Sequence, residues 1–188
     1  MGVVIGTDKG NIVYTGDFKF DQAAREGYQT DLLRLAEIGK EGVLALLSDS
    51  ANATSNDQIA SESEVGEEMD SVIADADGRV IVAAVASNLV RIQQVFDSAV
   101  AYGRRVVLTG TDVENIIRTA LRLKKLMITD ERLLIKPRDM AKFEDHELII
   151  LEAGRMGEPI NSLQKMAAGR HRYVQIKEGD LVLSLIHI

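Results

Sequence analysis

The stretch RVIVAAVASNLVRIQQVFDSAVAYG, residues 79–103, decides the fold class of this chain. Its first part, residues 79–87, is an apolar run that predicts a strand, and residues 89–103 predict a helix that Gly103 closes. The same alternation recurs with strands predicted at 105–110 and 147–154, and with helices over 111–126 and from Pro159. Strands that alternate with helices predict a parallel sheet covered by helices on both faces.

The first 58 residues are organised differently. VVIGTDKGNIVYTGD, at 3–17, predicts a β-hairpin with a Gly-containing turn. A short helix is expected to follow, with Thr30 as its N-cap and Gly39 as its stop, and then a buried strand at 43–50. The polar segment 51–60 is the predicted boundary between domains 1–58 and 59–188. At the other end, YVQIKEGDLVLSL (173–185) predicts two short strands around a Glu-Gly turn.

Composition excludes several classes of protein. The chain has 188 residues, no cysteine, 4% aromatic residues and 46% hydrophobic residues, with a mean hydropathy of −0.01. Disulfide frameworks and thiolate metal sites are therefore excluded, and a surface built from base-stacking aromatics is disfavoured. No apolar run is long enough for a membrane span and no signal-peptide pattern begins the sequence, so a cytoplasmic location is expected and no membrane partner.

The net charge of −7 is unevenly distributed. Ten acidic residues and no basic one lie between Lys40 and Arg79, whereas 17 basic and 13 acidic residues follow from Arg79 onward. Such a pattern could orient a polyanion locally, or both segments could be solvated faces.

Candidate chemistry lies where predicted strands end, because ligands of open parallel sheets collect beyond the carboxyl ends of the strands. Asp17 and Asp49 could serve there as a metal ligand and a general acid or base, or each could be a turn or N-cap residue. EAGRMGEP, at 152–159, could present amides to a phosphate or form a helix-entry turn. His146 is expected to face solvent. His171 could touch a phosphate, although solvent exposure is favoured, and no pair of histidines has metal-ligand spacing. A doubly wound small-molecule binder is disfavoured, since phosphate-loop glycines are absent.

Five motifs in order resemble ribonuclease J, a family of bacterial RNA-processing enzymes in the metallo-β-lactamase superfamily with an inserted β-CASP domain. They are TGDFKFDQ (15–22), GVLALLSDSANA (42–53), SE-x-x-VGEEM (61–69), ASN-x-x-RIQQ (86–94) and MGEP-x-x-SLQKMA (156–167). The resemblance implies an α/β fragment: the end of a metallo-β-lactamase αββα half at 1–58, followed by an incomplete β-CASP domain at 59–188. The tail 185–188 departs from the family pattern.

The resemblance also implies roles for individual residues. Asp17 matches the aspartate that bridges two metal ions, usually zinc, and Asp49 matches the aspartate that acts in proton transfer. The other metal ligands of the family lie outside this sequence, so the fragment alone is expected neither to bind two zinc ions tightly nor to cleave RNA. Candidate RNA contacts are Ser87, Asn88, Arg91, Gly157 and Glu158. Each has a structural alternative: Ser87 as an N-cap, Arg91 as a surface helix residue, and Glu158 as a helix-start residue.

The function implied is metal-dependent hydrolysis of RNA phosphodiesters, at 5′ ends and internally, in RNA processing and decay. Implied partners are RNA and a further copy or paralogue of ribonuclease J. Three departures, at Ala51, at Arg155 with Met156, and in TGTDVEN (109–115), together with the SDSANA form, resemble the second and typically less active paralogue of Firmicutes. The alternative function is therefore a weakly active or inactive RNA-binding subunit that stabilises a complex with its active paralogue.

Overall fold

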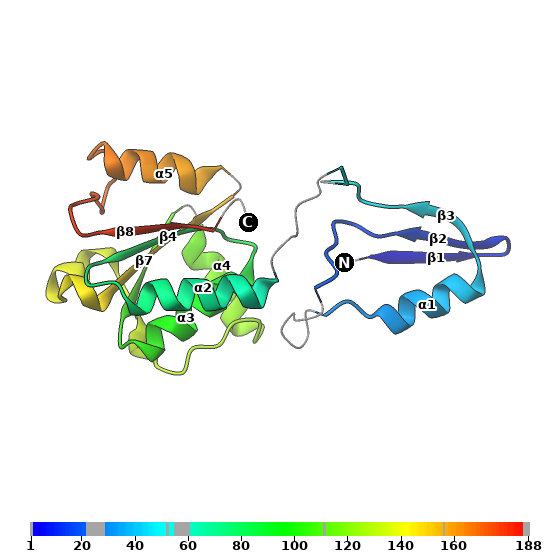
Figure 1. Ribbon diagram of the computed structural model, residues 1–188, viewed down its shortest axis with the longest axis horizontal. Coiled ribbons are helices and arrows are strands. Elements are labelled where there is room, and N and C mark those ends of the chain that lie inside the picture. The colour runs from blue at the N-terminus through cyan, green and yellow to red at the C-terminus, as the bar shows by residue number, and fades with distance from the viewer. Residues whose placement is uncertain are drawn as a thin grey trace. The chain divides into compact units, whose positions relative to one another are not determined.

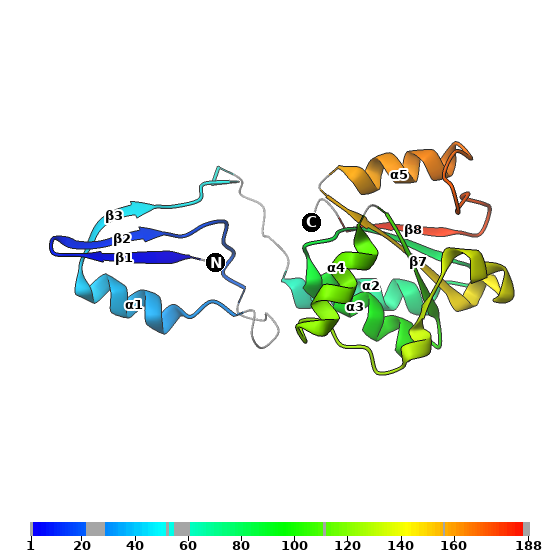
Figure 2. The same cartoon turned by 180° about the vertical axis from the view of Figure 1, so that it is seen from behind.

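A computed structural model of the chain describes residues 2–21, 29–51, 53–54, 61–110, 112–155 and 157–185. They belong to two compact units, Met1–Ser63 and Glu64–Ile188. Figure 1 and Figure 2 show the elements of each unit from opposite sides. Residues 55–60, at the predicted domain boundary, lie outside the described residues. None of the helices in the described ranges is long and apolar enough to cross a membrane.

Unit 1 is a three-stranded sheet with one helix. The elements are β1 (Val3–Thr7), β2 (Gly10–Tyr14), α1 (Leu32–Glu41) and β3 (Val43–Leu47). β1 and β2 form the predicted antiparallel hairpin, and α1 carries the chain over so that β3 pairs with β2 in parallel. The hairpin and the helix were therefore predictable from local signals, whereas the pairing of β3 was not.

The ends of α1 differ from the prediction. Asp31, not Thr30, is the N-cap, because its carboxylate accepts a hydrogen bond from the backbone N–H of Arg34 at 2.9 Å. The helix also continues through Gly39 and ends before Gly42, whose φ of 98° suits glycine. The glycine that ends the helix is the one in the positive-φ conformation.

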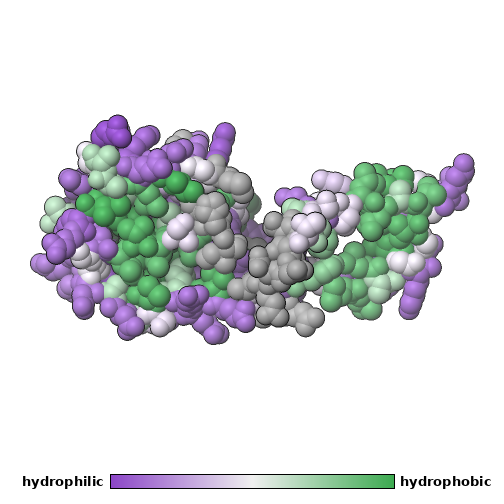
Figure 3. Space-filling view, turned by 45° about the horizontal axis from the view of Figure 1, so that its top comes forward, coloured by the Kyte–Doolittle hydropathy of each residue, from purple (hydrophilic) through white to green (hydrophobic). Residues whose placement is uncertain are grey.

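Apolar side chains of unit 1 are widely exposed. Val13 and Ile38 are buried, but Leu46 and Leu47, which point to opposite faces of β3, are 62% and 51% exposed. The side of unit 1 seen in Figure 3 is accordingly rich in hydrophobic residues. Exposed apolar surface of this kind is typical of a face that packs against another structural element or another protein.

Unit 2 contains a five-stranded sheet of order β6-β5-β7-β4-β8, in which all neighbouring strands are parallel. The strands are β4 (Val80–Val85), β5 (Arg105–Thr109), β6 (Leu134–Ile135), β7 (Leu148–Gly154) and β8 (Leu181–Ser184). The helices are α2 (Glu62–Ala74), α3 (Leu89–Ala101), α4 (Val113–Arg122) and α5 (Glu158–Ala167), with 3-10 turns at Glu131–Leu133, Pro137–Lys142 and Asp145–Glu147. This confirms the predicted α/β class with a mainly parallel sheet.

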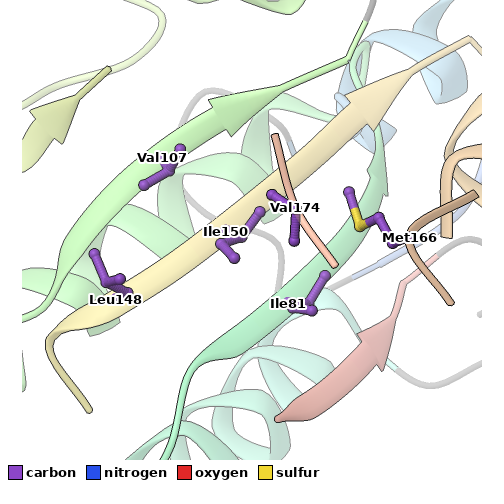
Figure 4. Packing of buried hydrophobic residues seen from close by; sticks show 6 residues of the cluster. All are labelled: Ile81, Val107, Leu148, Ile150, Met166 and Val174. Carbon is purple, nitrogen blue, oxygen red and sulfur yellow. The ribbon is translucent and has the colours of Figure 1, made fainter. Parts of the chain in front are cut away.

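Both faces of this sheet are covered by helices. Right-handed crossovers place α3 and α4 on one face, and α5, whose connection runs in the opposite direction, on the other. Under α5, side chains of three neighbouring strands meet Met166 and Val174 in a buried cluster (Figure 4). The strand residues of this cluster are Ile81, Val107, Leu148 and Ile150.

The C-terminal segment departs from the prediction of two strands around a Glu-Gly turn. Only β8 is a strand, and it pairs in parallel with β4. Residues 173–177 pack beneath α5 instead, since the N–H of Val174 donates to His171 and the N–H of Ile176 donates to the carbonyl of Met166. Tertiary packing has replaced the hairpin that the local pattern favours.

A buried ion pair joins the amino ends of β4 and β8. The Arg79 guanidinium donates to both carboxylate oxygens of Asp180, at 2.8 and 2.6 Å, and their side chains are 11% and 1% exposed. Asp180 also accepts from the N–H of Lys177 at 2.9 Å. Hydrogen bonds to Asp180 raise the pKa of Arg79 further, so the pair stays charged.

Replacing Asp180 with alanine is expected to lower the free energy of unfolding by about 3–5 kcal/mol, because Arg79 is left as a buried, unpaired charge. Urea denaturation measures this change. The control is Glu114→Ala, which breaks the exposed Glu114–Arg118 pair of α4 and is expected to change stability by no more than about 0.5 kcal/mol. Equal, small effects of both substitutions would contradict the role of the Arg79–Asp180 pair.

Candidate functional site

In unit 1, Thr15 joins the carboxyl ends of β2 and β3. Its N–H donates to the carbonyl of Leu47 at 3.0 Å, and its hydroxyl accepts from the N–H of Asp49 at 3.1 Å. Because β2 and β3 run in parallel, the segments that carry Asp17 and Asp49 leave the sheet at the same edge. Sequence reasoning missed Thr15, although a hydroxyl residue directly after a strand is a candidate for such a bond.

The two aspartates differ in their surroundings. Asp17 follows Gly16, which has a φ of 61°, and its exposed carboxylate makes no hydrogen bond or ion pair with any residue that the structure describes. Asp49 is half-buried, and its Oδ1 accepts from the N–H of Ala51 at 2.9 Å in a tight turn. Asp17 is therefore free to take a ligand, and Asp49 is held in place by its own turn. Their roles in metal binding and proton transfer stay predictions.

The described part of the chain holds no group of three or more histidine, cysteine, aspartate or glutamate residues arranged for a metal ion. A carboxylate such as that of Asp17 is a suitable oxygen ligand for zinc. Among the described residues, the carboxyl edge of the unit 1 sheet thus offers individual carboxylate ligands, not a complete metal site.

In unit 2, Ser87 and Asn88 follow β4 at the carboxyl edge of the sheet. Ser87 is exposed, and it is Asn88 that caps α3, since its Oδ1 accepts from the N–H of Arg91 at 3.2 Å. The alternative of Ser87 as the N-cap is therefore wrong. RNA contact by either residue stays a prediction.

Arg91 is not the surface residue that the sequence suggested. It is 4% exposed, and its guanidinium donates to the backbone carbonyl of Leu185, just beyond β8. Arg91 thus ties α3 to the last strand of the sheet. This burial counts against a direct contact with RNA.

Gly157 and Glu158 form the entry to α5. Gly157 is the N-cap with a φ of 88°, and the Glu158 carboxylate accepts from the N–H of Arg155 at 2.8 Å. The helix-entry turn is confirmed, and the Arg155 residue is exposed beside it. Several residues of the predicted motifs and of the tail lie outside the described residues: Asn52, Thr111, Met156 and 186–188. Phosphate contact at this turn stays a prediction.

A buried acid that sequence reasoning did not single out lies under α5. Glu152 is 2% exposed, and strand alternation puts it on the same face of β7 as Leu148 and Ile150. Its Oε2 and the nearby Oγ1 of Thr109 have no hydrogen-bond partner among the described residues. An acidic residue inside the apolar run LIILEAG was the signal that could have identified it.

His171 faces this acid and not solvent, which corrects the prediction; His146 is exposed, as predicted. The side chain of His171 is 13% exposed, and its Nδ1 accepts from the N–H of Val174 at 3.1 Å. An accepting Nδ1 leaves the proton of the imidazole on Nε2, which lies 4.0 Å from the Oε2 of Glu152. Nε2 is thereby occupied by a proton and unsuited to bind a metal.

Burial raises the pKa of Glu152, and this is the largest influence on the group. Thr109, Ser162 and His171 act in the opposite direction, and the neighbouring Glu158 raises the pKa further. The hydroxyl of Thr109 is near enough to Glu152 to influence its pKa, although it forms no hydrogen bond with any residue that the structure describes. Compared with an exposed glutamate, burial therefore shifts Glu152 toward the neutral carboxylic acid.

A known protein family matches the segment of the chain that forms the parallel sheet of unit 2. The family described as "Ribonuclease J, beta-CASP domain" matches residues 77–186. The chain belongs to the ribonuclease J family. This confirms the resemblance inferred from the five motifs.

Ribonuclease J relatives match nearly the whole chain. Ribonuclease J 2 of Streptococcus pyogenes serotype M3 is 94% identical over 182 residues, which are 97% of this chain and 33% of the relative. Ribonuclease J2 of Bacillus subtilis and ribonuclease J of Mycobacterium tuberculosis are each 40% identical over 97% of this chain. The chain spans about a third of the length of these relatives.

Replacing Glu152 with glutamine tests the buried acid of this β-CASP sheet. Between the ordinary pKa of 4.5 and the raised value, the folded protein holds a proton that the unfolded chain has released. The wild-type free energy of unfolding therefore falls as pH rises through that window. The free energy of unfolding of E152Q does not show this decrease, because glutamine has no titratable proton. E152Q should be more stable than wild type at neutral pH, with the difference vanishing below pH 4.5.

Urea denaturation over a pH series measures this difference, with the exposed Glu178→Gln as the control for a glutamate without burial. A loss of stability in E152Q that grows toward neutral pH would show that Glu152 is ionised and paired with His171.

Proposed function

We propose that the chain is part of a metal-dependent ribonuclease that hydrolyses RNA phosphodiesters, from 5′ ends and internally, in RNA processing and decay in the cytoplasm. One observation carries the proposal: Thr15 ties together the ends of two parallel strands from which Asp17 and Asp49 project. Membership of the ribonuclease J family supports the same reaction. The remaining metal ligands are proposed to come from other segments of the full-length protein.

Asp17 is the proposed metal ligand, and Asp49 the proposed proton carrier. A pair of zinc ions supplies, when bound, a nucleophile at neutral pH. Asp17 contributes a carboxylate that no other side chain of the described residues occupies. Asp49 has Oδ1 engaged by the N–H of Ala51, which fixes the carboxylate and leaves Oδ2 to hold or release a proton.

The apolar surface of unit 1 supports the metallo-β-lactamase assignment of residues 1–58. Leu46 and Leu47 expose opposite faces of β3, so the sheet requires cover on both sides. We assign this cover to the other elements of a metallo-β-lactamase αββα half in the full-length protein.

RNA is proposed to contact the carboxyl edge of the sheet in unit 2. Ser87 offers an exposed hydroxyl there, and α3 and α5 begin at this edge with Asn88 and Gly157 as their caps. Helix N-termini carry a partial positive charge that favours phosphate. Glu158 fixes the backbone of this turn, and its carboxylate is the least suited of the group to bind an anion.

The second candidate function is a weakly active subunit that binds RNA and stabilises a complex with a more active paralogue. The 94% identity to a protein named Ribonuclease J 2 favours it. At the site, Ala51 presents a methyl group next to Asp49, and Arg155 presents a long cation at the turn before α5. The two functions differ in whether the protein cleaves RNA without its paralogue.

In the full-length protein, Asp17→Asn and Asp49→Asn are each expected to lower the rate of RNA cleavage about 100-fold or more, through loss of metal binding and of proton transfer respectively. Cleavage of a 5′-monophosphorylated single-stranded RNA measures the rate. The control is Asp8→Asn, an exposed aspartate in the β1–β2 turn, which should leave the rate unchanged. Full activity in both site variants would refute the assignment, and a wild type active only with its paralogue would favour the second function.

The 188-residue chain by itself is expected to bind fewer than two zinc ions and to leave RNA uncut, because Asp17 is a single ligand. Zinc titration by calorimetry checks this, with the full-length protein as the reference. Tight binding of a zinc pair, lost in Asp17→Ala, would contradict the expectation.

A further inference from the structure

Basic residues of unit 2 fall into two groups, one buried and structural and the other exposed. Arg79, Arg91 and Arg104 belong to the first group. Arg79 pairs with Asp180, Arg91 binds the carbonyl of Leu185, and Arg104 binds carbonyls at the end of α2. These cations are unavailable to an external anion.

The exposed group includes a cluster at the C-terminal end of α5, in the sequence KMAAGRHRY (165–173), which contains no acidic residue. Lys165, Arg170 and Arg172 are exposed, and none of them forms an ion pair with a residue that the structure describes. Tyr173 is 47% exposed, and the guanidinium carbon of Arg172 lies 4.9 Å from the centre of its ring. We call these four residues the 165–173 surface.

The backbone of the 165–173 surface is held firmly. The N–H groups of Arg170 and His171 both donate to the carbonyl of Lys165, at 2.8 and 3.1 Å. The imidazole of His171 points inward and accepts from the N–H of Val174, so Arg170 and Arg172 flank a residue anchored in the interior. An anchored loop presents its cations with less loss of conformational entropy on binding.

We propose that the 165–173 surface binds single-stranded RNA. Lys165, Arg170 and Arg172 would contact phosphates, and the ring face of Tyr173 opposite Arg172 would stack on a base. The proposal rests on the proposed function, in that RNA is the substrate. It adds a contact about 15 Å from Gly157, at the opposite end of the 10-residue helix α5.

A single exposed tyrosine beside arginines is compatible with the low aromatic content, which disfavours only surfaces built from several stacking rings. RNA fits this surface better than an acidic peptide does, because the ring and the cations together match a base and its phosphates. Phosphate contacts of this kind make affinity depend on salt concentration, and stacking does not.

The test uses the full-length protein carrying Asp49→Asn to prevent cleavage, and fluorescence anisotropy with a labelled single-stranded RNA over a salt series. The double variant Arg170→Ala/Arg172→Ala is expected to reduce the slope of log K against log salt by ~1.4, about 0.7 for each phosphate contact. If the variant and the wild type bind equally at about 1 M salt, the variant binds roughly 25-fold more weakly than the wild type at about 0.1 M salt. Tyr173→Ala is expected to weaken binding about fivefold or more with an unchanged slope, and Tyr173→Phe to retain it.

The matched control is Arg122→Ala/Lys125→Ala, which removes the same charge from exposed positions at the end of α4, on the opposite face of the sheet. It is expected to preserve the slope, as is Arg170→Lys/Arg172→Lys, which keeps the charge and checks folding. An unchanged slope and affinity in the Arg170→Ala/Arg172→Ala variant would overturn the proposal.

Sedimentation of the same proteins distinguishes a surface that binds RNA from one that binds another protein. Loss of self-association or of paralogue binding in Arg170→Ala/Arg172→Ala, with RNA affinity intact, would assign the surface to a protein and overturn the proposal. Absence of RNA binding in the parent protein would refute the proposed function itself, and is thereby distinct from failure at the 165–173 surface alone.

Discussion

The parallel pairing of β7 with β4 on one side and β5 on the other is the constraint on which unit 2 depends. All seven residues of β7 are buried, so both of its faces must be covered. Parallel neighbours require crossover connections, and these supply α3 and α4 on one face and α5 on the other. The same connections bring the starts of α3 and α5, with Asn88 and Gly157, to one edge of the sheet.

Glu152 is the exception within that strand, because it is a buried acid among apolar residues. A leucine at this position would continue the apolar cluster of Leu148 and Ile150, whereas the acid brings Thr109 and His171 into a small polar layer beneath α5. Buried polar groups with incomplete hydrogen bonding lower stability, so sequences that keep them depart from local consistency. His171 then connects this layer to the loop that carries Arg170 and Arg172.

The sequence predicted the elements better than their contacts. The strands β4, β5 and β7 and the helices that follow them were foreseen because apolar periodicity and glycine positions are local signals. The first of the two strands expected in 173–185, before the Glu-Gly turn, does not form, since Val174 and Ile176 pack into the core beneath α5 and do not pair with a strand. Burial of Arg91 and His171 could not be predicted either, because it depends on Leu185 and Glu152, which become their neighbours only in the fold.

At the candidate site, the motifs identified Asp17 and Asp49, but only the fold shows that Thr15 links their strands. Thr15 could have been noted as a hydroxyl after a strand, whereas its partner Asp49 lies 34 residues further along. Side chains that act within one turn, such as Glu158 at the start of α5, can be inferred from their spacing in the sequence. Those that act across the fold require knowledge of which strands are neighbours.

The order of the strands has a consequence for biosynthesis. Arg79 and Asp180, which join β4 to β8, are 101 residues apart, so β4 leaves the ribosome long before its outer neighbour exists. Until then one edge of β4 offers unpaired backbone groups, which is the situation in which nascent chains pair wrongly or aggregate. This edge of β4 stays unpaired until β8 is synthesised, which gives the nascent domain a long interval in which a chaperone could protect it.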